Sequence, residues 1–401
     1  MHWIEREAYL LDGVRTPFGK YGGALASLDS IELGTCVISE MIRRHPEARH
    51  ADGALFGVVV QAGLGQNPAR IAATRAGVAL TTPALTLNSV CLASLESACE
   101  AARRIRGGEG QEYLVGGFDS MSRVVSFIPG DDSTAQEPRS ALFHDGLDCA
   151  LTGLSMGVLS DGCNHDLQIT REVQDDWAFR SQIRAADGAP IREHDELMVV
   201  RTPAGVVTSD QGIRADTSRE KIRALKPAFT TDGTITAANA SQMSDGASAG
   251  LVVSGARLAQ LDAVPLARIV DWASVAGPDA TLHLQPARAI QKLLAQRRLS
   301  VDDIALFEIN EAFAGVVVAS MRELGLAEAS VNVNGGAIAL GHPLGATGFR
   351  LLLTLALEMR RRKVRRGIAT LCGGGGQGLA VLIENDAAEE FSPSTRNQEE
   401  S

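Results

Sequence analysis

A cysteine at a predicted strand-to-helix junction is the first residue whose type and position could support chemistry. Cys91 lies in the segment T-L-N-S-V-C-L-A-S, between a short apolar stretch at 84–87 and the helical apolar spacing of 92–105. Free N–H groups and the helix dipole favour a thiolate at the start of a helix, so the position suits a nucleophile. Taken alone, a free cysteine near a strand end is more often a buried structural residue.

Three further segments could supply partners for that thiol. His342 stands in G-H-P-L-G-A-T-G, where glycines and a proline would hold an imidazole in a fixed place. Cys372 precedes four glycines, including Gly374, whose N–H groups could hold an oxyanion. Asn310 opens N-E-A-F at the end of a predicted strand, where its amide could orient a water or a carbonyl. A polarised thiol, a fixed imidazole and a glycine-rich donor loop are what two-step acyl transfer needs.

Three rival motifs match known patterns by letter. The G-x-G-x-x-G of 373–378 is followed by L-A-V-L-I, which predicts a strand where a dinucleotide-binding motif needs a helix. The G-x-S-x-G of 153–157 resembles a serine-hydrolase elbow, but no clear strand is expected before it and no helix after it. Cys163 and His165 could ligate a metal, but no second pair accompanies them, so no metal site is predicted.

Length and composition limit the class of protein. A chain of 401 residues is too long for one ordinary core, so several domains or an internal duplication are expected. The formal net charge of −10 argues against nucleic-acid or membrane-surface binding. Six cysteines without a C-x-x-C pair, and an N-terminus unlike a signal peptide, predict a protein of the reducing cytoplasm. No apolar run of 18 residues occurs, so no membrane-spanning segment is expected.

The apolar patterns predict alternating strands and helices at both ends of the chain. The expected strands are 8–15, 55–60, 84–87, 113–115, 251–253, 267–270, 305–309, 331–333, 368–371 and 379–383. The expected helices are 30–44, 68–76, 92–105, 286–297, 312–324 and 347–361. In each half a strand near an asparagine leads into a helix and a later strand ends in glycines, which favours a duplicated α/β unit.

The stretch between residues 121 and 245 has a different pattern. Its hydrophobic periodicity is weak and only one helix, 170–187, stands out, so it reads as a loop-rich insertion. Five basic residues gather in its distal part, namely Arg214, Arg219, Lys221, Arg223 and Lys226. This group is either a solvated polar face or a phosphate-holding patch, and the pattern leaves both open.

Four motifs in one order and spacing resemble the thiolase family over nearly the whole chain. They are the N-x-x-C of 88–91, the N-E-A-F of 310–313, the G-H-P-x-G-x-[ST]-G of 341–348 and the C-x-G-G-G-x-G of 372–378. The resemblance implies an α/β fold with a duplicated, five-layered αβαβα core and a loop-rich inserted domain. The expected parts are an N-terminal half at 1–120 completed by about 246–270, a loop domain over coenzyme A at 121–245, a C-terminal half at 271–385 and a disordered tail at 386–401.

The resemblance also implies an activity, acetyl-CoA C-acyltransfer, in which acetyl-CoA units are condensed or a 3-oxoacyl-CoA is cleaved with CoA. Cys91 would be acylated as His342 takes its proton, and Cys372 would act as base or acid at the α-carbon of the second acetyl-CoA. One thioester oxygen would be held by His342 and a water on Asn310, the other by the N–H groups of Cys91 and Gly374.

Further implications concern the ligand and the assembly. Arg214 and Ser241 match positions that contact coenzyme A, and Phe229 and Phe313 match apolar positions beside the pantetheine. The resemblance implies acyl-CoA and CoA as the only small partners, no cofactor besides these substrates, and a homodimer or homotetramer.

Several positions depart from the family pattern near the expected acyl pocket. Leu92 stands where glycine usually follows the nucleophile, Gln242 follows N-A-S where glycine is common, and Ser155 replaces a frequent histidine. The segment 277–286 lacks the usual glycines. Chain length and direction therefore stay open, and Leu92→Gly is expected to shift acyl-chain preference. The alternatives are a related Claisen-condensing synthase and a non-catalytic thiolase-like protein that binds CoA or lipid.

Overall fold

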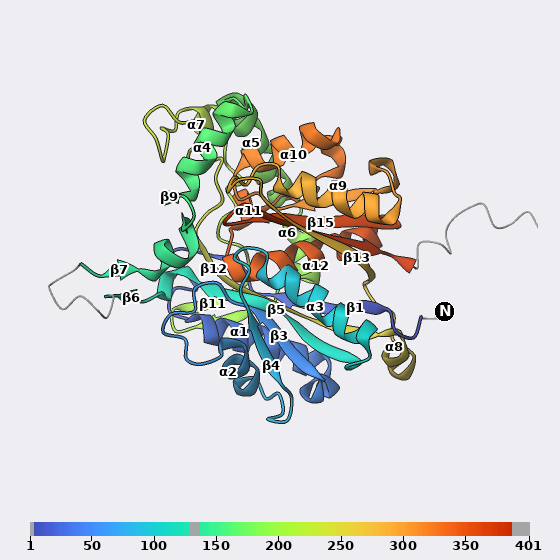
Figure 1. Cartoon of the computed structure of the whole chain (residues 1–401). Helices are drawn as coiled ribbons and strands as arrows, with labels where there is room; N and C mark the ends of the chain where they lie inside the picture. Colours follow the sequence, from blue (N-terminus) through green and yellow to red (C-terminus); the bar gives the residue numbers. More distant parts are fainter. Residues whose placement is uncertain (1–3, 129–136, 387–401) are drawn as a thin grey trace, which may run out of the picture.

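The computed structural model describes residues 4–128 and 137–386 (Figure 1). The strands are β1 (Ala8–Arg15), β2 (Gly19–Lys20), β3 (Gly53–Gly57), β4 (Ala84–Leu87), β5 (Glu112–Ser120), β6 (Ser126–Phe127), β7 (Arg139–Ser140), β8 (Asp148–Cys149), β9 (Leu154–Ser155), β10 (Val200–Thr202), β11 (Gly205–Val207), β12 (Ser244–Ser254), β13 (Ala267–Ala276), β14 (Leu306–Ile309), β15 (Arg366–Gly373) and β16 (Gln377–Glu384). The helices are α1 (Ser30–Arg44), α2 (Pro68–Arg75), α3 (Ala93–Gly107), α4 (Met156–Asp166), α5 (Arg171–Asp187), α6 (Ala189–Asp195), α7 (Arg219–Arg223), α8 (Gly255–Leu261), α9 (Gln285–Arg297), α10 (Ala314–Leu324), α11 (Ala337–Leu340) and α12 (Leu344–Arg362). The tail was expected at 386–401, and residues 387–401 lie outside the described part of the chain.

Two half-sheets of the same design form the centre of the molecule. The first has the strand order β4-β3-β5-β12-β1, the second has β14-β15-β16-β13, and β1 pairs with β13 where they meet. In each half, the strand that comes first in the chain pairs antiparallel with the one that comes last: β1 with β12, and β13 with β16. In each half, two strands that lie between these in the chain pair in parallel: β3 with β5, and β14 with β15. The duplication expected from the sequence is therefore present in the sheet topology.

Helices cover both outer faces of these half-sheets and fill the space between them (Figure 1). One core cluster lies under α1 and α2, another contains the buried residues of α9 and α10, and the cluster between the half-sheets contains those of α3 and α12. The result is five layers, αβαβα, as predicted. Residues of α3 and α12 that face both sheets are buried almost without exception, which makes this middle layer the core of the protein.

Local sequence signals explain most of the element boundaries. Helix α1 begins after Asp29 in a capping box with Glu32, which satisfies N–H groups that the helix leaves open. The strand predicted at 113–115, ending at the pair Gly116-Gly117, is too short, because β5 continues through both glycines to Ser120. Gly116 has φ +142 and a Cβ there would lie 2.1 Å from Ser248 O, so this glycine permits close strand contact within the sheet. The strand expected at 331–333 is reduced to one bridge, Phe307 with Val331.

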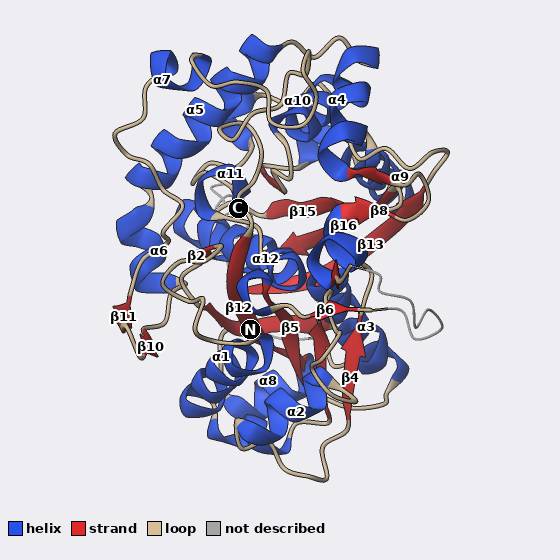
Figure 2. Ribbon diagram, turned by 90° about the vertical axis from the view of Figure 1, so that its left-hand side faces the viewer, coloured by secondary structure: helices blue, strands red, loops and turns tan. Residues whose placement is uncertain are grey.

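The loop-rich stretch contains more helix than the sequence pattern predicts. Besides α5, where a helix was expected, it includes α4, α6 and α7, and Figure 2 shows α4, α5 and α7 gathered at one end of the molecule near α10. Helix α4 follows Ser155, whose side chain accepts from Val158 N, so the expectation that no helix follows the G-x-S-x-G motif is wrong. No helix in the described part of the chain is long and apolar enough to span a membrane.

Candidate active site

The turn that presents Cys91 connects β4 to α3. Val90 has φ 54, a left-handed conformation that is unfavourable for a β-branched residue, and Cys91 follows it two residues before the first residue of α3. Asn88 braces the turn: its Oδ1 accepts from Val90 N at 3.0 Å and its Nδ2 donates to Val59 O at 3.1 Å. The predicted strand-to-helix junction at Cys91 is confirmed.

His342 lies between α11 and α12 with its ring held on both sides. Its Nδ1 is 2.7 Å from Thr347 Oγ1, and that hydroxyl donates its single proton to Pro343 O at 2.8 Å. The hydroxyl must then accept from the imidazole, so we assign the proton to Nδ1. Nε2 is left as an acceptor and lies 3.3 Å from Asn310 Nδ2. This tautomer has the unprotonated nitrogen that a general base requires.

Asn310 and Cys372 come from the ends of adjacent parallel strands. Asn310 follows β14, is fully buried, and keeps a side-chain oxygen, Oδ1, without a partner among the described residues. Cys372 is the second-last residue of β15 and leads into the glycine run that contains Gly374. Strands β14 and β15 pair with Ile309 opposite Thr370, so both side chains arrive at the same edge of the sheet.

A small apolar cavity of about 70 Å³ joins these groups. The predicted residues Cys91, His342, Cys372 and Gly374 all line it. The remaining lining comes from Val90, Gly146, Leu147, Met156, Ser241, Leu282, Ala312, Phe313 and Leu344. Two thiols and one imidazole from three separate segments therefore face one space, and Asn310 contacts the imidazole from behind.

A second, larger cavity of about 410 Å³ continues from the first. His342, Ser241, Met156 and Phe313 line both cavities, so the two form one path. Phe229 lines the larger cavity, and its ring meets that of Phe313 edge to face with centroids 6.1 Å apart. A largely apolar path leading to a reactive cavity suits a long, flexible acyl carrier.

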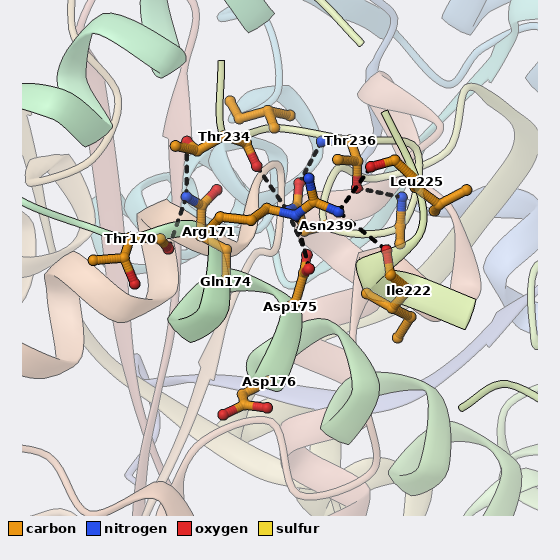
Figure 3. A network of polar contacts seen from close by, with 12 residues as sticks. Thr170, Arg171, Gln174, Asp175, Asp176, Ile222, Leu225, Thr234, Thr236 and Asn239 are labelled. Carbon is orange, nitrogen blue, oxygen red and sulfur yellow. Dashed lines mark hydrogen bonds and ion pairs between the residues drawn. The ribbon is translucent and has the colours of Figure 1, made fainter. Parts of the chain in front are cut away.

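Phe229 can occupy this place because Gly157 lies beneath it. A Cβ at Gly157 would come within 2.2 Å of the Phe229 ring. The loop that carries Phe229 is tied to α5 by a polar network (Figure 3): Arg171 donates to Leu225 O at 3.1 Å, and Asn239 Nδ2 donates to Asp175 at 2.9 Å. Most of the wall of the larger cavity is thus built by the loop-rich stretch.

Arg214 lies at the outer end of this region and is exposed. It lines the larger cavity and also a separate hollow of about 200 Å³, which it shares with Lys221. Arg219 instead forms an ion pair with Asp176 and lies over the ring of Phe179. The basic group is therefore divided: Arg214 and Lys221 face a hollow, and Arg219 serves packing within the loop-rich stretch.

The electrostatics of the inner cavity differ from the expectation of a thiolate. Burial raises the pKa of Cys91 to about 12, and the N–H groups of Cys91 and Gly374, which act the other way, are outweighed. Burial, helped by the Arg350 charge, lowers the pKa of His342 to about 3. Burial also raises the pKa of Cys372. These shifts favour two thiols and a neutral imidazole over the thiolate that the helix start led us to expect at Cys91, because apolar surroundings penalise every charge.

The structure also changes which residues are candidates for shaping the acyl pocket. Leu92 is not among the residues that line the inner cavity. It is buried in the middle layer, and a Cβ at Gly373 would meet it at 2.9 Å. Leu282 and Met156 line the cavity instead. The sequence signal for Leu282 as a pocket residue was the lack of glycines in the segment before α9. Spacing alone did not show that Leu282 lines the cavity that contains the thiols.

Comparisons with known proteins agree with this architecture. Residues 8–256 match the thiolase N-terminal domain and residues 263–385 the thiolase C-terminal domain. The chain is 40% identical over 390 residues to the acetyl-CoA acetyltransferase of Escherichia coli, which covers 94% of this chain and 99% of that protein. It is 39% identical over 395 residues to the acetyl-CoA acetyltransferase of Pseudomonas aeruginosa, covering 95% of this chain and 100% of that protein.

Solved structures give the same result. The acetyl-CoA acetyltransferase of Bacillus anthracis superposes with a TM-score of 0.90 at 33% identity, covering 96% of this chain and 100% of that one. A thiolase of Ascaris suum in complex with coenzyme A superposes with a TM-score of 0.87 at 34% identity, covering 94% and 100%. The matched domains and the relatives are those of an acyltransferase, and the chain belongs to the thiolase family.

Proposed function

We propose that this thiolase transfers short acyl groups through an acyl-cysteine at Cys91, cleaving a 3-oxoacyl-CoA with CoA or condensing two acetyl-CoA in reverse. The observation that carries the proposal is the meeting of Cys91, His342, Cys372 and Gly374 around one cavity of about 70 Å³. A cavity of this size admits only a few non-hydrogen atoms, which favours acetyl over long or branched acyl groups.

The first step is acylation. Cys91 Sγ attacks the 3-oxo carbon of the substrate, and His342 Nε2 takes the thiol proton as the new carbon–sulfur bond forms. The bond between the α- and β-carbons breaks, and its electron pair goes to the departing α-carbon of acetyl-CoA. Cys372, which its raised pKa keeps as a thiol at rest, donates its proton to that carbon. The products are acyl-Cys91, a Cys372 thiolate and acetyl-CoA.

The second step returns both cysteines to their starting state. The Cys372 thiolate takes the proton from an incoming CoA thiol, and the CoA sulfur attacks the acyl carbonyl. Cys91 leaves as a thiolate and recovers its proton from the His342 imidazolium. Every proton is exchanged among these residues and the two substrates, so the mechanism uses CoA thioesters without any other cofactor.

Two groups of donors would hold the developing oxyanions. The N–H groups of Cys91 and Gly374 would face the acyl oxygen, and His342 with a water on Asn310 would face the thioester oxygen of the departing acetyl-CoA. The unpartnered Oδ1 of Asn310 and its Nδ2 contact with His342 support this role. Loss of one such donor typically costs about 3 kcal/mol of transition-state stabilisation.

The larger cavity is proposed as the coenzyme A site. Phe229 and Phe313 would lie along the apolar pantetheine, Ser241 at the junction of the two cavities, and Arg214 near the phosphates. Lys221 lines the same 200 Å³ hollow but is ion-paired with Asp216, so Arg214 would be the main contact for the phosphates. Both thiols must stay reduced in this scheme, which fits the cytoplasm.

The proposed assembly is a homodimer, alone or paired into a tetramer. Strand β4, which precedes the Cys91 turn, forms the outer end of its half-sheet and pairs only with β3 within the described chain. Leu80 and Leu85 near it are 77% and 39% exposed. An edge strand with exposed leucines is a ready surface for a second copy. Light scattering should give the native chain the mass of a dimer or tetramer and Leu85→Lys a smaller mass. A native chain that is already monomeric, or a Leu85→Lys variant with the native mass, would contradict this proposal.

The proposal is tested by exposing the enzyme to acetyl-CoA and measuring intact mass. One acetyl group should appear on the native chain, map to Cys91 by peptide analysis, and be absent from Cys91→Ala. Thiolysis of acetoacetyl-CoA should accompany it. CoA binding without acylation would identify a non-catalytic thiolase-like protein, and acylation without thiolysis would identify a condensing synthase.

A further inference from the structure

Asp119 has a buried carboxyl group that accepts hydrogen bonds from the loop of His342 and from the segment that supports the Cys91 turn; burial raises its pKa to about 7, and these N–H groups act the other way. It lies near the end of β5 and is 1% exposed. We propose that Asp119 is a positioning residue for acyl transfer, holding the nucleophile turn and the imidazole loop in a fixed relation. This inference rests on the proposed function of Cys91 and His342.

The contact on the imidazole side is at the start of α12. Asp119 Oδ2 accepts from Gly345 N at 2.6 Å, and Gly345 is the second residue of that helix, three residues after His342. N–H groups in the first turn have no partner within the helix, and a carboxylate there also interacts favourably with the helix dipole. A Cβ at Gly345 would lie 2.7 Å from Asp119 Oδ2, so the glycine is what lets the carboxylate approach.

The contact on the nucleophile side passes through the segment after β3. Asp119 accepts from Val59 N at 3.2 Å and from Val60 N at 3.3 Å. Val59 O in turn accepts from Asn88 Nδ2, and Asn88 Oδ1 accepts from Val90 N beside the thiol. The left-handed Val90 persists only if its surroundings hold it, and these bonds connect that turn to the carboxylate.

The sheet register gives Asp119 a position equivalent to that of Cys372. Gly57 pairs with Gly117 in the first half, and Ile309 pairs with Thr370 in the second. Asp119 and Cys372 each stand two residues beyond the β5 or β15 member of that pair. The same place in the two halves is thus occupied by a carboxylate that accepts N–H groups and by a thiol that faces the cavity.

Asp119→Asn is the decisive variant because it keeps the volume but offers one acceptor oxygen to three N–H groups. We expect kcat for acetoacetyl-CoA thiolysis to fall by 10- to 100-fold, since small displacements of reacting groups have effects of this size. KM for CoA should change less than twofold, because the larger cavity does not contact Asp119.

Asp161→Asn is the matched control. Asp161 is also buried and accepts from the N–H groups of Thr234 at 2.8 Å and Ile235 at 3.0 Å, but these belong to the loop-rich stretch beside the larger cavity. Its loss should raise KM for CoA more than it lowers kcat. Equal kcat losses in both variants would overturn the specific role of Asp119 and leave only a general structural one.

Two further measurements can each contradict the proposed role of Asp119. Iodoacetamide alkylation of Cys91, which requires no acyl transfer, should slow at least fivefold in Asp119→Asn; an unchanged rate contradicts the proposal even if the native enzyme proves inactive on acyl-CoA. Absence of Cys91 acetylation in the native enzyme would contradict the proposed function alone. Asn88→Asp keeps the acceptor for Val90 N but removes the donor to Val59 O. Its kcat loss should not add to that of Asp119→Asn, and additive losses, or a native kcat in Asn88→Asp, would contradict the inference.

Discussion

The two α/β halves place different chemistry at equivalent points. Cys91 stands two residues before the first residue of α3, and His342 stands two residues before the first residue of α12. Helices α3 and α12 both come after the edge strand of their half-sheet, β4 and β14, and they pack together in the middle layer. The fold thus brings two helix starts to one place, and the amino acid at each start decides which becomes nucleophile and which becomes base.

The difference between the halves lies in how each loop is held. The first half presents Cys91 on a turn with a strained Val90 and leaves the residue partly exposed. In the second half, by contrast, His342 is buried. It follows Gly341, which has φ 111, and its ring is hydrogen-bonded to Thr347. A nucleophile must reach its substrate, whereas a base must keep one tautomer, so exposure suits the first role and burial the second.

The largest expected effect separates the two thiols. Cys91→Ala should abolish acetylation and lower thiolysis by at least about 10⁴-fold, because no acyl carrier remains. Cys372→Ala should lower thiolysis comparably but still allow acetyl transfer from acetyl-CoA to Cys91. Intact-mass analysis distinguishes the two, and a Cys372→Ala enzyme that cannot be acetylated would mean that the thiols act as a single unit.

The next effect concerns the base. His342→Gln should slow acetylation of Cys91 by about 10²- to 10⁴-fold, the usual contribution of a positioned base. Because burial lowers the pKa of His342 to about 3, the native acetylation rate should show no loss from protonation of this group between pH 8 and 5. Stopped-flow acylation at several pH values tests this, and a rate falling with a midpoint near 6.5 would show that the imidazole is solvated during turnover.

A smaller effect should distinguish the two leucines near the thiols. Leu282→Ala enlarges the inner cavity, so relative kcat/KM should shift about tenfold toward 3-oxohexanoyl-CoA over acetoacetyl-CoA. Leu92→Ala should leave that ratio unchanged but lower the free energy of unfolding by about 2–5 kcal/mol, since it empties part of the middle layer. Urea unfolding and paired kinetics measure both. A changed ratio in Leu92→Ala would restore the role that the sequence suggested for it.

The smallest effect is on stability at acid pH. Burial lowers the pKa of His342 to about 3 and that of His283 to about 4, so both stay neutral in the folded protein while the unfolded chain takes up protons below pH 6.5. The unfolded state then binds more protons, and stability should fall as pH falls from 6.5 toward 4, by about 2 kcal/mol per histidine at pH 5. Urea unfolding of His283→Gln at pH 7.5 and 5 should show a smaller loss than the native chain, and an equal loss would contradict this account.

Regular elements with strong periodicity were predicted well. The helices α1 and α9 and the strand β1 match the expected ranges closely because apolar spacing acts locally, and α5 matches because of its Thr170 N-cap and its length, not its periodicity. The errors occur where contacts between segments far apart in the sequence determine the length of an element. Strands β5 and β12 extend beyond their apolar runs because they pair with each other along almost their full length. Helix α4 was missed because it is short and contains two glycines, Gly157 and Gly162, which disfavour a helix when only the local sequence is considered.

The sequence by itself determined the residues that could do chemistry and the order in which they occur. Cys91, Asn310, His342 and Cys372 stand in motifs whose local geometry is set by glycine, proline and strand ends. Only the tertiary structure decided their protonation and their neighbours. Burial depends on packing between the two halves, so the raised pKa of the Cys91 thiol could not be predicted from its local sequence. Likewise, the link from Asp119 to both loops requires segments far apart in the chain to meet, which local patterns cannot specify.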